Sequence, residues 1–382
     1  MKVLLAPDSF KGSLSAADAA EAMALGIQRI GPIQSIEVEL LPVADGGEGT
    51  LECLLAALQG NRITVPVHDP LGRLIDASYG LLPDGTVIIE MAVAAGLTLV
   101  DELEQDILHA NTFGVGELVM HALDQGSTSF VIGVGGSATN DAGVGMLAAL
   151  GMRMFSQTGR ELPPTPEALL ELHRVDLSGL HPNLARASIR VACDVTNPLC
   201  GSNGASAVFG PQKGASPDDV GLLDRALERF ADVTEAELGR SFRNVPGVGA
   251  AGGLGGALHG VLRGELVKGI DLVLDVLEFD QRVATADLVL TGEGRTDGQT
   301  GQGKVVMGIA ARAAQSGVPV FCLAGSVTKE AEELYGRGVD ALFALARGPI
   351  SLQESIEQAG YLLASTAETA VRAFIAGRKR GG

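Results

Sequence analysis

The sequence of 382 residues is poor in positive charge. It holds 28 Lys and Arg against 46 Asp and Glu, which gives a formal net charge of -18. This balance argues against a surface built for non-specific binding of nucleic acid or an anionic membrane, because both are polyanions. It does not exclude an anionic small molecule, because a few local cations or a metal ion can reverse the field inside a site.

Long hydrophobic runs are also missing. The longest mostly apolar runs, such as MAVAAGLTLV, have about ten residues, whereas a membrane-spanning helix needs about 20. The N-terminus, MKVLLAPDSF, joins one Lys to a short apolar run and then to Ala-Pro-Asp. That pattern predicts a buried strand that enters a loop, rather than a signal peptide.

Cysteine is scarce, tryptophan is absent, and glycine is abundant. The four cysteines form no C-x-x-C pair, so neither a zinc site nor a disulfide framework is indicated, and a reducing cytoplasm is the expected location. The 52 glycines predict many tight turns and close backbone approaches, as in α/β proteins that bind small ligands through loops. They also make accidental glycine motifs frequent.

Several short apolar runs end in polar, glycine-rich loops that lead into helical patterns. VLLA precedes PDSFKGS, IEVELLPVA precedes DGGEG, DLVLT precedes GEGRTDGQTGQG, and VPVFCLAG precedes SVTKE. Strands buried on both faces and alternating with helices predict a parallel sheet. Ligands of such sheets bind beyond the carboxyl ends of the strands, so these loops are expected to share one edge.

The middle of the chain has a different pattern. RITVPVHDP, DASYGLL and TVIIEMAVAA are closely spaced strand candidates, which predicts an antiparallel or mixed sheet. The predicted fold is therefore α/β, with a parallel-sheet domain built from residues 1–68 and 281–382. Residues 69–280 form a second, inserted α/β domain with a mixed sheet. The joints are expected near His68 and Asp280.

Two glycine motifs resemble nucleotide-binding loops but fail on context. Gly298–Val305, GQTGQGKV, has Val305 where a Walker A loop needs Ser or Thr, and it does not follow its strand directly. Lys304 still opens a predicted helix, whose N-terminus attracts anions, so phosphate binding and an ordinary turn both remain open. Gly247–Gly252, GVGAAG, is preceded by RSFRNVP rather than by a buried strand, which disfavours a dinucleotide site.

Other polar loops have two interpretations each. GVGGSATNDAG offers clustered amides, hydroxyls and carboxamides for an anion, although helix capping needs such residues too. Asp194 is either a general base or a turn former, Asn197 has a structural alternative in its Asn-Pro turn, and Lys213 is either a phosphate ligand or a solvated loop lysine. Acidic residues of DGGEG and GEGRTD supply the hard oxygens that Mg²⁺ prefers, but isolated acidic loop residues are usually just solvated.

Taken together, seven segments resemble the signatures of the bacterial class I glycerate kinase family, of the glycerate 2-kinase type. These segments are APDSFKGSLSA, PVADGGEGT, GGSATNDAG, VACDVTNPLCG, FGPQKGAS, GAAGGLGGA and TGEGRTDGQT, in this order from Ala6 to Thr300. The resemblance implies a flavodoxin-like domain with an inserted α/β domain and a site in the cleft between them. It also implies phosphorylation of D-glycerate by ATP with Mg²⁺, and favours 2-phosphoglycerate as product.

On that resemblance, each candidate residue receives an expected role. The catalytic set is Lys11, Asp194, Arg295 and Asp297, with Asp194 preferred as the base and Asp297 second. Glycerate is assigned to Asp8, Ser9, Ser137, Thr139, Asn140, Asp141 and Asn197. ATP and its phosphates are assigned to Lys213, Gly292, Gly294 and Lys304, and Mg²⁺ is assigned to Asp45, Glu48 and Glu293.

Two rival functions remain. One is an NAD-dependent dehydrogenase that uses GVGAAG, and the other is a non-catalytic sugar-acid sensor that keeps the fold. In each case the expected partners are small molecules, with no nucleic acid and no membrane, and the sequence allows a homo-oligomer.

Overall fold

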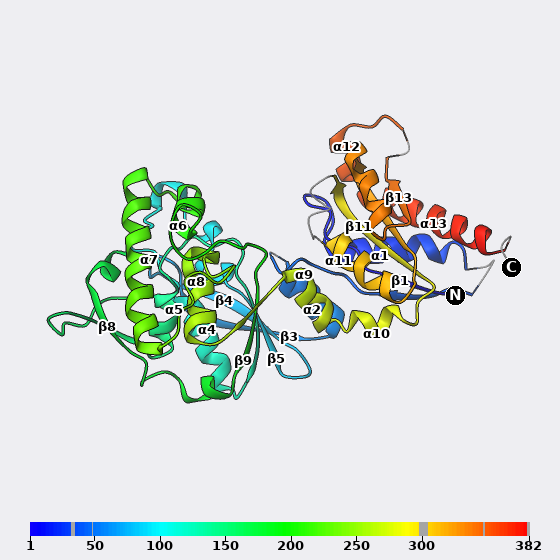
Figure 1. Ribbon diagram of the computed structural model, residues 1–382. Helices are drawn as coiled ribbons and strands as arrows, with labels where there is room; N and C mark the ends of the chain where they lie inside the picture. Colours follow the sequence, from blue (N-terminus) through cyan, green and yellow to red (C-terminus); the bar gives the residue numbers. More distant parts are fainter. Residues whose placement is uncertain (32–34, 48, 298–304, 347, 380–382) are drawn as a thin grey trace. The chain divides into compact units, whose positions relative to one another are not determined.

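The computed structural model describes residues 1–31, 35–47, 49–297, 305–346 and 348–379 (Figure 1). The chain divides into two units, each with its own sheet. Unit 1 comprises Met1–Asp45, Glu52–Gln59 and Ile270–Gly382, and unit 2 comprises Gly46–Leu51 and Gly60–Gly269. This division resembles the expected plan, in which one domain is built from both ends of the chain and a second one is inserted.

The boundaries differ from the expected joints near His68 and Asp280. Strand β3 (Asn61–His68) belongs to unit 2, because it pairs along its whole length with β4 (Leu74–Leu81). Helix α9 (Gly269–Val276) belongs to unit 1 from Ile270 onward, because the Ile270 side chain fills the space beside Gly308 of α11 (Val305–Gln315).

Unit 1 is built on a five-stranded sheet in which every pairing is parallel. Its order is β13-β12-β11-β1-β2, which in chain order within the unit reads 2-1-3-4-5, the flavodoxin-like arrangement. The central strands are apolar because helices cover both faces. The bounds are Lys2–Leu5 for β1, Glu37–Leu40 for β2, Leu288–Thr296 for β11, Val320–Val327 for β12 and Ala341–Ala344 for β13.

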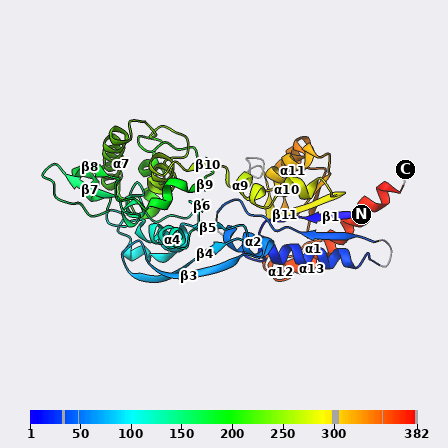
Figure 2. The same ribbon diagram turned by 90° about the horizontal axis from the view of Figure 1, so that it is seen from below.

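Helices cover both faces of this sheet. Figure 2 shows α1 (Ala16–Gln28) and α13 (Ala359–Arg378) together on one face and α10 (Phe279–Val283) with α11 on the other. Helix α1 begins after Ser15, whose side chain accepts a hydrogen bond from the Asp18 amide. The remaining helices of unit 1 are η9 (Lys329–Arg337) and α12 (Leu352–Glu357), and α2 (Thr50–Leu58) lies mostly in this unit.

Unit 2 contains the predicted mixed sheet, in the order β10-β9-β6-β5-β4-β3. The pairings from β5 to β10 are parallel, and β4 is antiparallel to both of its neighbours. The remaining bounds are Thr86–Glu90 for β5, Ser129–Gly133 for β6, Ser188–Ala192 for β9 and Glu265–Val267 for β10. A separate antiparallel pair joins β7 (Arg153–Ser156) to β8 (Leu172–Asp176).

The helices of unit 2 surround one apolar core that contains Val87, Ile89, Phe130 and Val191. Its long helix α7, which packs against α6 (Figure 1), starts with a capping box between Ser216 and Asp219. The α-helices are α3 (Ala92–Ala95), α4 (Phe113–Asp124), α5 (Val144–Ala149), α6 (Ala205–Phe209), α7 (Pro217–Leu238) and α8 (Leu254–Gly256). Short 3₁₀ segments are Leu97–Leu99, Glu102–Glu104, Glu167–Glu171, Pro182–Arg186, Pro211–Lys213 and Ala250–Gly253, and Ala257–Val261 is a π-helix.

No helix in the described part of the chain combines the length and the apolar character that crossing a bilayer requires.

Candidate active site

In unit 1, the candidate residues gather at the carboxyl ends of β1 and β11. The loop after β1 lies along β11, because the Ala6 amide donates to the Leu290 carbonyl at 2.8 Å and the Asp8 amide to the Gly292 carbonyl at 2.9 Å. The strand order reverses at this point, since β2 lies on the other side of β1. Flavodoxin-like sheets bind their ligands at such a switch point.

The expected loop GEGRT is a strand instead. Strand β11 continues to Thr296 and stays paired with β12, up to Thr296 opposite Val327. Gly292 serves close packing rather than a turn, and Gly294 lies in the same strand. A Cβ atom at Gly292 would overlap the Leu323 carbonyl oxygen, and one at Gly294 would lie 3.4 Å from the Lys11 amide nitrogen. The prediction of an anion-binding turn at Gly292 and Gly294 is therefore wrong in its local structure.

The carboxylates of Asp45 and Glu293 repel that of Asp8 electrostatically at this edge. The pKa of Asp8 is raised to about 6, mainly by burial and then by the charges of Asp45 and Glu293. The Ser9 amide donates to Asp8 Oδ1 at 2.6 Å and opposes this shift. Glu293 also accepts a hydrogen bond from Thr296 Oγ1 at 3.0 Å. Such mutual repulsion fits a site that receives a cation.

The described residues do not themselves form a coordination shell. Among them, no group of three His, Cys, Asp or Glu side chains is placed to hold a metal ion. Glu48, one of the predicted Mg²⁺ ligands, and Lys304, a predicted phosphate ligand, lie outside the described residues. So does most of the motif Gly298–Val305, in which only Val305 is described.

The cations of this group are accessible to solvent. Lys11 is exposed in the loop after β1. The Arg295 side chain is 67% exposed, and its Nε lies 3.2 Å from Asp297 Oδ2. Both cations can therefore meet an anionic ligand without displacing a buried partner.

In unit 2, the loop that follows β6 carries the second group. Ser137, Thr139, Asn140 and Asp141 are all buried there. Asn140 Nδ2 donates to Ser206 Oγ at 2.9 Å. Thr139 Oγ1 and Asn140 Oδ1 have no hydrogen-bond partner in the described part of the chain, although buried polar atoms are normally paired. The loop thus holds polar atoms beyond those that its own fold requires.

Lys213 belongs to the same group, and it is not a solvated loop lysine. It is 3% exposed, and its Nζ donates to Ser137 Oγ and to the Thr139 carbonyl, both at 2.7 Å. Burial lowers the pKa of Lys213 to about 7, against the attraction of Asp141. Lysine side chains are seldom buried this deeply unless they are paired or take part in catalysis.

Asp141 is the centre of a buried hydrogen-bond network. Its carboxylate accepts hydrogen bonds from the Thr112 amide at 2.9 Å, Thr112 Oγ1 at 2.8 Å, the Gly143 amide at 2.9 Å and the Gly145 amide at 3.0 Å. Burial raises the pKa of Asp141, and these donors oppose the shift. Because it is fully buried and already accepts four bonds, Asp141 holds the loop in place, and its contact with glycerate stays a prediction.

The glycine-rich segment around Gly247–Gly252 braces this loop. A Cβ atom at Gly252 would overlap the Thr139 carbonyl oxygen, and the Ala142 amide donates to the Gly252 carbonyl at 2.9 Å. Ala142 and Ala251 both hold left-handed backbone angles, with φ of 57° and 52°, which is strain of the kind found at functional sites. No strand precedes Gly247 within the described residues 239–246, so the dinucleotide interpretation lacks its required context.

Asp194 and Asn197 follow β9, as predicted. Asp194 is exposed, and its Oδ1 accepts a hydrogen bond from the Gly269 amide at 2.8 Å. Asn197 Nδ2 donates to the Asn203 carbonyl at 2.8 Å, which ties down its own turn. The structure therefore supports the turn-forming interpretation of Asn197, whereas Asp194 keeps an accessible carboxylate.

Sequence reasoning missed Glu90, at the carboxyl end of β5. Its Oε1 accepts a hydrogen bond from the Leu51 amide at 2.7 Å, and Glu90 lies opposite Gly133 at the start of the loop that carries Ser137. A carboxylate that directly ends a buried strand, in TVIIE, was the available signal.

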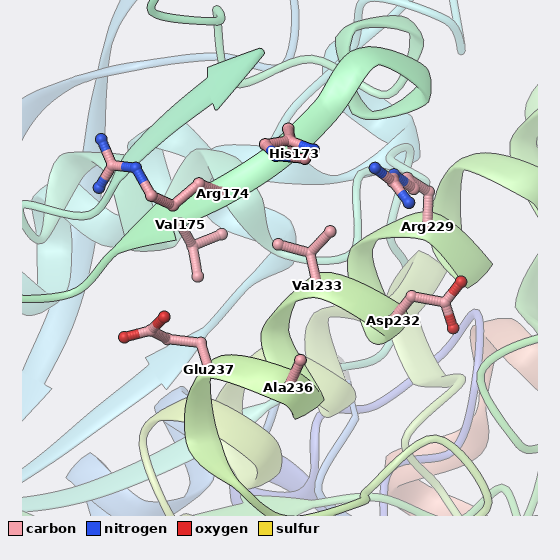
Figure 3. Close-up of a pocket in the computed structure, with 8 residues that line it drawn as sticks. All are labelled: His173, Arg174, Val175, Arg229, Asp232, Val233, Ala236 and Glu237. Atoms are coloured by element: carbon pink, nitrogen blue, oxygen red, sulfur yellow. The ribbon is translucent and has the colours of Figure 1, made fainter. Parts of the chain in front are cut away.

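A surface groove of about 380 Å³ lies elsewhere in unit 2, between β8 and α7. Figure 3 shows Val175 and Val233 pointing toward each other, with His173 and Arg229 nearby. None of the candidate residues lines this groove.

The fold and these two groups define a two-unit α/β protein whose polar loops suit small anionic ligands. The profile described as "Glycerate kinase family" matches residues 3–375. The chain therefore belongs to the glycerate kinase family, and the expected enzyme class, a phosphotransferase with an alcohol group as acceptor, is confirmed.

Individual relatives agree with this family. The chain is 46% identical over 368 residues to the glycerate kinase of Bacillus subtilis (strain 168), covering 96% of each chain. It is 44% identical over 360 residues to the glycerate 2-kinase of Escherichia coli (strain K12), covering 94% of each. A crystal structure from Salmonella typhimurium LT2, described provisionally as glycerate kinase 2, matches with a TM-score of 0.91 and 43% identity over 99% of each chain.

Proposed function

We propose that the protein transfers a phosphoryl group from ATP to D-glycerate, with Mg²⁺, and forms 2-phosphoglycerate and ADP. The observation that carries the proposal is the convergence of polar residues at the β1–β11 switch point, in a chain that matches glycerate kinases over nearly its full length. The product follows the relative named glycerate 2-kinase. A cytoplasmic location is part of this proposal.

The unit 1 group has the chemistry that a nucleoside triphosphate requires. Lys11 and Lys304 are proposed to neutralise phosphate oxygens, as phosphoryl transfer depends mostly on positioning and on charge neutralisation. Arg295 is exposed and planar, so it suits either the transferring phosphoryl group or a carboxylate. Gly292 and Gly294 were also predicted to contact the nucleotide, although Gly292 packs closely against Leu323.

The acidic residues of unit 1 are proposed to hold Mg²⁺ together with the phosphates. The candidates are Asp45, Glu48 and Glu293, and the mutual repulsion of Asp8, Asp45 and Glu293 makes a cation favourable there. A bound Mg²⁺ would neutralise phosphate charge in the transition state. The chain's own contribution is to hold Asp8 through the Ser9 amide and Glu293 through Thr296.

The unit 2 group is proposed to bind the hydroxy acid. Ser137, Thr139 and Asn140 supply hydroxyl and carboxamide groups on a loop that Asp141 holds rigid. Asp8, Ser9 and Asn197 were also predicted to contact glycerate, and Lys213 was predicted to contact phosphate. Of these, Asn197 and Lys213 already make intramolecular hydrogen bonds. Asp194, with Asp297 second, stays the predicted acceptor of the hydroxyl proton. That both groups serve one reaction is likewise a prediction.

The proposal is tested by following ADP release with D-glycerate, ATP and MgCl₂, and by locating the phosphate in the product by ³¹P–¹H NMR. ADP release that depends on D-glycerate, with phosphorus coupled to the C2 proton, is the expected result. Coupling to the C3 protons would overturn the regiochemistry alone. Failure of D-glycerate to stimulate ADP release would overturn the function.

A further inference from the structure

The contact between Lys213 and the loop after β6 is unusual for a turn residue. Lys213 ends the short segment Pro211–Lys213, in which Pro211 and Gln212 are exposed, yet its own side chain is directed inward. Its Nζ reaches Ser137 Oγ and the Thr139 carbonyl at 2.7 Å each. Ser137 is 6% exposed and directly follows the exposed residues Gly135 and Gly136. The serine hydroxyl thus contacts the buried amine, on a loop whose two preceding residues are exposed.

Within the described residues, Lys213 has no ion-pair partner that would keep its amine protonated. Among the described residues, no carboxylate lies within ion-pair distance of its Nζ. Asp141, on the loop before α5, is the charged group that acts on it, and that carboxylate already accepts four hydrogen bonds. The other groups near the turn, Ser137, Thr139 and Gln105 beside Gly214, are neutral. An amine so placed is able to exchange a proton near neutral pH.

We propose that Ser137 and Lys213 form the proton relay for the acceptor hydroxyl of the substrate. This inference rests on the proposed function. The hydroxyl gives its proton to Ser137 Oγ, while the proton of Ser137 passes to the neutral Nζ of Lys213. The substrate oxygen forms a bond to the γ-phosphorus of ATP, and the bond from that phosphorus to the β–γ bridging oxygen breaks, so that ADP leaves with the electron pair. The Lys213 ammonium then returns its proton to solvent.

Asp194 is the competing acceptor. Its carboxylate is exposed, and one oxygen accepts from the Gly269 amide. An exposed carboxylate is a weak base at neutral pH, whereas burial tunes a lysine to the range where general bases work best. The two alternatives can be separated by experiment, because the relay requires the neutral amine of Lys213 and proton transfer to Asp194 does not.

The closing experiment measures kcat and KM for D-glycerate from pH 5.5 to 9.5 in the full chain and in two variants, Ser137→Ala and Lys213→Met. Wild-type kcat should rise through about pH 7 and then level off, because only the neutral amine accepts the proton. In each variant kcat should fall roughly 10²- to 10⁴-fold and should no longer rise through pH 7, whereas KM should change much less. Lys379→Met, on an exposed lysine at the end of α13, is the matched control. It should keep the wild-type kcat and its rise through about pH 7.

A second measurement does not depend on turnover. The Nζ of Lys213 is titrated by NMR in ¹⁵N-lysine-labelled protein, and its signal is assigned by its loss in Lys213→Met. Where that variant fails to fold, Lys213→Arg replaces it, since arginine keeps its proton at every pH tested. Titration near pH 7 supports the relay. A lysine that stays protonated above pH 9, or an acid limb that survives in a folded Lys213 variant, overturns the relay. Absence of glycerate-dependent ADP release in the wild type instead overturns the proposed function, and the relay with it.

Discussion

Replacement of Asp8 by Asn is expected to stabilise the protein while removing activity. The folded state raises the pKa of Asp8 from 3.8 to about 6, mainly through burial and then through Asp45 and Glu293. The folded state therefore binds the proton more tightly than the unfolded state does, and stability falls as pH rises from about 4 to about 6. The full penalty, about 3 kcal/mol, remains at any higher pH.

The amide of Asn removes this penalty but keeps an oxygen for the Ser9 amide. A neutral acceptor is weaker than a carboxylate by roughly 1 kcal/mol, so the net gain at pH 8 should be about 1–3 kcal/mol. At pH 4 the wild-type carboxyl is already protonated in the folded state, so the gain should vanish. Activity should fall, because the substitution removes a charge from the proposed substrate and metal site.

The assay is thermal unfolding at pH 4, 6 and 8 with EDTA present, so that divalent cations do not offset the repulsion. For domains of this size, each kcal/mol corresponds to about 2–4 °C in Tm. Glu21→Gln, on the exposed part of α1, is the control and should change Tm little at any pH. A variant that is destabilised at pH 8, or that gains equally at pH 4, would refute the reasoning.

Three further predictions concern unit 2. Gly252→Ala should lower the free energy of unfolding, measured in urea, by about 3 kcal/mol or more, because its Cβ would overlap the Thr139 carbonyl. Gly239→Ala has a similar φ and open space around it, so it should lower the free energy of unfolding by only about 1 kcal/mol. Equal losses in the two variants would contradict this. Asp141→Asn should lower stability by roughly 3 kcal/mol, because an amide cannot accept all four hydrogen bonds, and an unchanged Tm would argue against that network. Cys200, whose pKa burial raises to about 12, should react with iodoacetamide at pH 8 only as the protein unfolds, and rapid alkylation of the native protein would be inconsistent with this.

Much of unit 1 could be predicted from the sequence because its strands are buried on both faces and end in polar loops. That pattern led to the parallel sheet and to the shared edge of Asp8 and Glu293. It failed at GEGRT, where glycine suggested a turn. Gly292 is needed because a side chain there would overlap the Leu323 carbonyl of β12, and such a contact between distant segments is not visible in local sequence.

The roles inside unit 2 were harder to predict, because they depend on which polar groups face one another after folding. Lys213 in FGPQKG has the local features of a solvated turn residue, and its hydrogen bonds to Ser137 and Thr139 become visible only in the folded chain. Asp141 could not be distinguished from its neighbour Asn140, since both follow the same strand. The domain joints also depended on tertiary contacts, such as the packing of Ile270 beside Gly308.

The pairing of β1 with β11 has a consequence for biosynthesis. Thr291 Oγ1 donates to the Ala6 carbonyl across 285 residues of chain, so the first strand has no central neighbour until most of the polypeptide has left the ribosome. At about 5–20 residues per second, that delay is roughly 15 to 60 s. The inserted unit can fold during this interval, whereas β1 still lacks its central partner β11 and is accessible to chaperones.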